Sequence, residues 1–127
     1  MSREEIRDRI ADLNVEDFIW IIYLGIIALS YYSNHLERKY FLNNDIFSKN
    51  QYRKLIIIIF SILIVVYLYF LKDSVESIRD LKPTDSEKKK RFVYLSFIGS
   101  LFIAVSGLIF LYISLKDQDL DVELAFN

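Results

Sequence analysis

Apolar residues gather in three runs without charged side chains, over 18–33, 55–71 and 92–115. A helix that crosses the roughly 30 Å hydrocarbon core of a bilayer needs about 20 apolar residues. The third run is long enough by itself, and flanking residues can extend the other two because lysine stems reach from apolar to polar surroundings. These runs have no polar face, which a helix of a soluble bundle would carry. The pattern predicts an all-α integral membrane protein with three transmembrane helices.

Capping signals divide the chain into four helices and a tail within a single membrane domain. Boxes of the form S/T-x-x-E/Q begin at Ser2, Ser48 and Thr84, and Asn14 is a further helix-capping residue type. Pro83 stops a helix because it lacks a backbone N–H. The expected elements are an amphipathic helix over 3–13, spanning helices over 15–41, 49–81 and 85–116, and a tail over 117–127.

The segment before the first run has one apolar stripe. Ile6, Ile10 and Leu13 recur with helical spacing, and the opposite face is charged. This pattern predicts a helix that lies along the membrane surface or against other helices. The second and third spanning helices are expected to extend beyond the bilayer as a helical hairpin.

The last nine residues alternate between apolar and polar types. Leu120, Val122, Leu124 and Phe126 share one side of an extended chain, which predicts a short strand that pairs with a partner's sheet edge. The alternative is a frayed terminus solvated by its acidic residues. The alternation leaves both interpretations open.

Aromatic and basic residues gather near the ends of the runs, where amphipathic side chains favour the membrane interface. The expected interface anchors are Trp20, Tyr31, Tyr32, Tyr67, Tyr69, Tyr94, Tyr112, Lys88, Lys89, Lys90 and Arg91. Three spans put the termini on opposite sides of a cell membrane. The N-terminal side has ten Lys and Arg residues against six on the other, which favours a cytoplasmic N-terminus. The charges that directly flank the first span favour the reverse.

The composition argues against several chemistries. The chain has no cysteine, which excludes disulfides, thiolate catalysis and cysteine-ligated metals. The apolar runs hold no ionisable group of the kind that membrane enzymes and proton relays bury. His35 and the acidic tail do not form a closed ligand set. We therefore expect no catalytic, metal or cofactor site, and nothing indicates a nucleic-acid partner.

The third run contains the most informative polar pattern. Small residues at four-residue spacing let membrane helices approach closely. The expected packing or oligomer face comprises Ser96, Gly99, Ser100, Ala104 and Gly107, with Gly25 and Ala28 of the first span as a counterface. The serines could instead line a pore in an oligomer.

A surface helix followed by three spans resembles, in outline, the trimeric prokaryotic diacylglycerol kinases and three-span phage holins. The catalytic glutamates of the kinases have no equivalent motif here, and the acidic tail differs from the basic tail of holins. We expect a small non-catalytic membrane protein, with the bilayer as its surroundings, that self-associates or serves as a subunit or scaffold of a membrane complex. The alternatives are an oligomeric channel or holin-like pore and an immunity-type protein against a membrane-active toxin.

Overall fold

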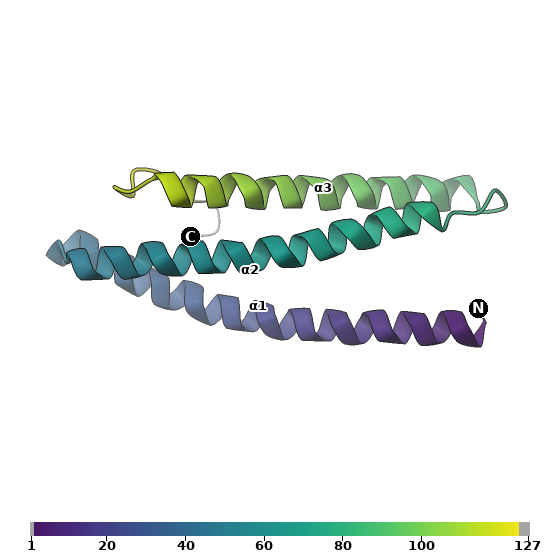
Figure 1. Ribbon diagram of the computed structural model, residues 1–127, viewed down its shortest axis with the longest axis horizontal. Helices are drawn as coiled ribbons and strands as arrows, with labels where there is room; N and C mark the ends of the chain where they lie inside the picture. Colours follow the sequence, from purple (N-terminus) through teal and green to yellow (C-terminus); the bar gives the residue numbers. More distant parts are fainter. Residues whose placement is uncertain (1, 125–127) are drawn as a thin grey trace.

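The computed structural model describes residues 2–124, which form three helices and no strand (Figure 1). The helices are α1 (Arg3–Asn43), α2 (Ile46–Arg79) and α3 (Glu87–Lys116). Each is long and apolar enough to span a membrane, as the sequence predicts. Helix α2 lies between α1 and α3 and runs antiparallel to both (Figure 1).

Helix α1 is continuous through Asn14, so the predicted division into helices over 3–13 and 15–41 is wrong. The predicted start is confirmed, because the Ser2 hydroxyl accepts a hydrogen bond from the Glu5 N–H. No Gly or Pro interrupts residues 3–24, and an ion pair between Arg9 and Glu16 (3.7 Å) joins the two predicted segments. Residues 3–13 are therefore the first turns of α1. At 41 residues the helix is about 60 Å long.

Both later helices begin at a residue that differs from the predicted cap. Asp45 caps α2, and its carboxylate accepts the Phe47 and Ser48 N–H groups as well as the Ser48 hydroxyl. These bonds, chiefly the hydroxyl bond, lower the pKa of Asp45. Ser86 caps α3 in place of Thr84, since its hydroxyl accepts the Lys89 N–H. Helix α2 ends at Arg79, ahead of Pro83.

Helices α2 and α3 pack closely because small residues of α3 face aromatic and polar side chains of α2. A methyl group at Gly107 would lie 3.0 Å from the Tyr67 ring, so only glycine fits without movement. The hydroxyls of Ser74 and Ser100 are 2.8 Å apart. Ser74 donates its hydrogen to the Phe70 carbonyl, which makes Ser100 the donor of the interhelical bond.

Helix α1 packs on α2 alone. Its buried residues, Ile19, Ile26, Ser33 and Leu36, are seven, seven and three positions apart, so they form one stripe along the helix. Within residues 2–124, α1 and α3 do not contact each other. The molecule is therefore a layer of three helices in which each outer helix packs on one neighbour only.

Candidate functional site

Two apolar cavities lie along α2 and together make up a two-part surface. Its α1 half is a cavity of about 440 Å³ lined by α1 residues such as Tyr23 and Ile27 and by α2 residues. Its α3 half has a volume of about 430 Å³ and is lined by α3 residues such as Phe102 and Ser106 together with Phe60 and Tyr67. Phe60 and Tyr67 line both halves. We call this surface the trough.

The predicted small-residue face divides between two environments. Ser100, Ala104 and Gly107 pack against α2 within the chain. Ser96 and Gly99 are exposed, and a methyl group at Gly99 would meet no atom within 4 Å. The first group therefore holds the chain's own helices together, whereas the second remains accessible to other molecules.

Gly25 and Ala28 lie exposed on α1, which makes no contact with α3. They therefore form no counterface for α3 within the chain. The physical reason is that α2 separates the two outer helices. Contact of these residues with a neighbouring copy stays a prediction.

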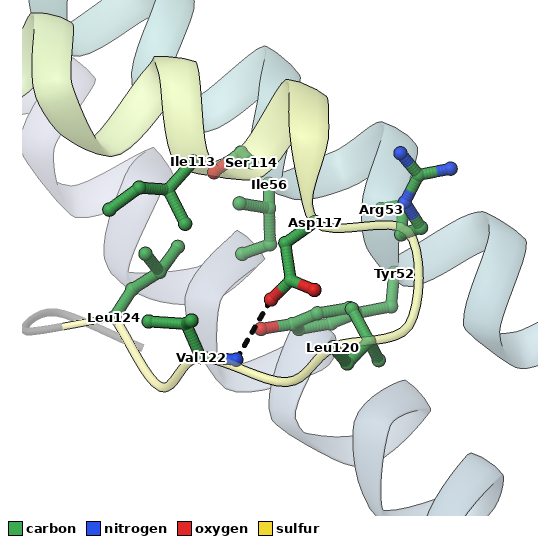
Figure 2. A pocket seen from close by; sticks show the side chains of 9 residues that line it. All are labelled: Tyr52, Arg53, Ile56, Ile113, Ser114, Asp117, Leu120, Val122 and Leu124. Atoms are coloured by element: carbon green, nitrogen blue, oxygen red, sulfur yellow. Dashed lines mark hydrogen bonds between the residues drawn. The ribbon is translucent and has the colours of Figure 1, made fainter.

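The chain after α3 turns back over α2, which corrects the predicted strand and the alternative of a solvated tail for residues 117–124 (Figure 2). Leu120 has a positive φ of 58°, which interrupts an extended chain. Leu124 is buried in the core beside Tyr52 and Ile56. Phe126 lies outside the described residues. Of the apolar positions in this loop, Leu124 is buried and Leu120 is half-buried, whereas Val122 is exposed.

Polar contacts hold this loop, residues 117–124, in place. The Asp117 carboxylate accepts the backbone N–H groups of Asp121 (3.0 Å) and Val122 (2.8 Å), the latter drawn in Figure 2. Lys49 forms an ion pair with Asp119 at 3.6 Å, which joins the loop to α2. Glu123 lines a surface hollow together with α1 residues. The loop therefore connects α3 to both other helices at one end of the molecule.

Acidification is expected to release this loop. The backbone N–H donors, first that of Asp121, lower the pKa of Asp117 below its ordinary value of 3.8. The ionised carboxylate therefore contributes its full stabilisation above pH 3.8, and this contribution is lost as the pH falls through the pKa of Asp117 in the folded protein. Hydrogen exchange at the Asp121 and Val122 amides, corrected for intrinsic rates, should show protection at pH 5 that disappears under strong acid. Asp117→Asn should weaken the protection at pH 5, whereas Asp119→Asn should leave it nearly intact. Equal protection in both variants would contradict this assignment.

The predicted interface anchors have different surroundings. Trp20, Tyr31, Tyr32, Tyr94 and Tyr112 are exposed on the outer helices. Tyr69 is half-buried, and Tyr67 packs against Gly107. Tyr52 of α2 is buried beneath the C-terminal loop.

The basic residues lie at the turn between α2 and α3. Lys89 pairs with Asp85 at 3.2 Å, and Lys90 pairs with Glu87 at 3.6 Å. The Asp85 carboxylate also accepts the Lys82 N–H, and this bond is the main cause of its lowered pKa. Lys88 and Arg91 lie over the Phe92 ring, at 5.8 and 5.6 Å from its centre.

Within residues 2–124, no three His, Cys, Asp or Glu side chains are grouped so that they could hold a metal ion. His35 lies beside the Tyr32 ring, with 6.4 Å between the ring centres. The features that sequence reasoning missed are the trough and the docked C-terminal loop. Asp117 lies four and five residues before the two N–H groups that it accepts, so this acidic residue is the feature of the sequence that could have indicated the loop. The trough has no such feature in the sequence, because it depends on how three helices pack.

Comparison with protein-family models, curated proteins and solved structures finds no match for this chain.

Proposed function

We propose that this protein is a non-catalytic integral membrane protein that crosses the cell membrane three times and self-associates, with a helix of a second copy in the trough. The observation that carries the proposal is the separation of α1 and α3, which leaves the trough open along α2. The same assembly could serve as a subunit or scaffold of a larger membrane complex.

The lining of the trough suits a helix better than a polar ligand. Its exposed lining is mainly apolar in both halves. One small residue of α3, Ser106, is exposed and lines the trough directly. In a bilayer, helices associate where small residues allow their backbones to approach, because lipid tails supply no hydrophobic driving force.

The orientation within this proposal follows from the basic residues. The N-terminus of α1 and the turn between α2 and α3 lie at the same end of the molecule (Figure 1). This end has ten of the sixteen Lys and Arg residues, so we propose that it is cytoplasmic. The C-terminal loop then lies on the opposite side of the membrane.

The pore alternative has less support. Ser100 would be a central lumen residue, but its hydroxyl is bonded to Ser74 within the chain. Ser96 and Ser106 remain exposed, so a lumen would depend on them alone.

Filling the trough is expected to weaken self-association. Ser106→Phe places a ring in the α3 half of the trough, and we expect the dissociation constant of the oligomer to rise at least about tenfold, or about 1.4 kcal/mol. The measurement is the distribution of oligomers against protein-to-lipid ratio, by single-molecule photobleaching in vesicles.

The matched control is Ser61→Phe, on the exposed side of α2, where the Ser61 hydroxyl bonds only to the carbonyl of Ile57 in its own helix. This variant should associate as the unmodified chain does. A monomeric unmodified chain at all ratios, or equal effects of both variants, would overturn the proposal.

A further inference from the structure

A second cavity lies at the turn between α2 and α3, outside the trough. Its volume is about 450 Å³, and it is lined by Ser77 of α2, by Ser86 at the cap of α3, and by Lys88, Lys89, Phe92, Val93 and Ser96 of α3. The lining changes from basic and hydroxyl side chains at the helix end to an aromatic ring and a small residue further along α3. We call this cavity the turn pocket.

The charges around the turn pocket favour an anion. Residues 82–91 contain five basic and two acidic side chains. Lys89 and Lys90 are neutralised in part by Asp85 and Glu87. Lys88, by contrast, forms no ion pair in the described part of the chain and is held over the Phe92 ring. Its ammonium group is therefore available to an anionic ligand.

The hydroxyl of Ser86 adds a directional donor. Its oxygen accepts the Lys89 N–H at 3.1 Å, which leaves the hydroxyl hydrogen free to donate to a ligand oxygen. A cation and a hydroxyl donor on one cavity wall suit a phosphate, which accepts both kinds of hydrogen bond.

The apolar end of the turn pocket continues along α3. Phe92, Ser96 and Gly99 are exposed and follow one another at intervals of about one helical turn. Phe102, one turn further along α3, lines the α3 half of the trough. One leaflet of the hydrocarbon core is about 15 Å thick, which corresponds to roughly ten helical residues. The distance from Phe92 to Phe102 therefore matches the depth of one acyl chain.

We propose that the turn pocket binds an anionic phospholipid, with the phosphate against Lys88 and Ser86 and one acyl chain along the Phe92, Ser96 and Gly99 side of α3. A phospholipid fits better than a free phosphate because the basic wall of the cavity is followed along α3 by the exposed residues Gly99 and Phe102, over about one leaflet's depth. The site requires that α3 cross a bilayer, but it does not require self-association.

The test is lipid titration of the delipidated protein by native mass spectrometry. Phosphatidylglycerol should bind more tightly than phosphatidylcholine, and Lys88→Gln should weaken phosphatidylglycerol binding about fivefold. The matched control, Lys116→Gln, removes one charge at the opposite end of α3 and should have little effect. Equal binding of the two lipids, or equal effects of the two variants, would overturn the proposal.

A second variant separates the pocket from general charge attraction. Ser96→Leu fills the apolar end of the turn pocket without changing any charge, and should weaken phosphatidylglycerol binding severalfold. Ser61→Leu, on the exposed side of α2, should not. If Ser96→Leu binds like the unmodified chain, or if millimolar inorganic phosphate displaces the lipid, the site does not hold a phospholipid. Lys88→Gln lies outside the trough and should not change the oligomeric state, so this test fails or succeeds independently of self-association.

Discussion

Phe60→Ala is expected to destabilise the packed helices by about 2 kcal/mol, because it leaves a cavity between α2 and its neighbours. The Phe60 side chain is 2% exposed and lies 5.7 Å from the ring of Phe110, measured between ring centres. A buried Phe→Ala change in a soluble protein costs roughly 3–5 kcal/mol, which combines a transfer term with a cavity term. Lipid tails are as apolar as the phenylalanine ring, so moving the ring from lipid into the protein contributes little free energy. In a bilayer only the cavity term should therefore remain.

The matched control is Phe102→Ala on α3. The Phe102 side chain is 66% exposed, so its removal deletes the same atoms without opening a buried space. Unfolding of both variants in mixed micelles of increasing denaturing detergent should show a lower midpoint for Phe60→Ala and a midpoint close to that of the unmodified chain for Phe102→Ala. Equal loss in both variants would show that Phe60 is not at the centre of the packing.

The three long helices could be predicted because each apolar run is uninterrupted and much longer than a strand. The ends were less predictable, since several residues near each start are competent caps. Ser48 and Thr84 both satisfy the sequence pattern, but Asp45 and Ser86 make the capping bonds. Asn14 likewise resembles a cap, but nothing in the chain around it ends the preceding helix.

Three small residues of the third run, Ser100, Ala104 and Gly107, pack against α2, a partner that could not be read from the sequence. Ser100 and Gly107 face Ser74 and Tyr67 on α2. Helical spacing shows which face of a helix a residue occupies. It does not show which other helix packs against that face, because this depends on the antiparallel arrangement of α2 and α3 and on the position of α1. The trough was missed for the same reason.

The tail shows how one pattern can have two structural causes. Alternating Leu120, Val122 and Leu124 are typical of a strand, but the backbone N–H groups of this segment bond to Asp117 rather than to a sheet. A side chain that accepts two consecutive amides replaces the strand partner that the segment would otherwise need. This capture depends on the loop returning toward its own helix, which periodicity alone does not reveal.

Three crossings of a bilayer are the central claim, since self-association through the trough and lipid binding at the turn pocket both depend on them. The chain has no cysteine, so single cysteines can report on each helix end without further changes. Two exposed positions lie at the N-terminal end of the molecule: Asp8 near the start of α1 and Asp80 directly after α2. Two others lie at the opposite end: Asn50 near the start of α2 and Gln118 shortly after α3.

The decisive measurement is the reaction of these four single-cysteine variants with a membrane-impermeant maleimide in intact and in permeabilised cells. The account predicts that Asn50→Cys and Gln118→Cys react in intact cells, whereas Asp8→Cys and Asp80→Cys react only after permeabilisation. The opposite pattern would reverse the orientation and leave the three crossings intact. Reaction of Asp80→Cys and Asn50→Cys from the same side, or recovery of the chain in the soluble fraction without detergent, would contradict the account.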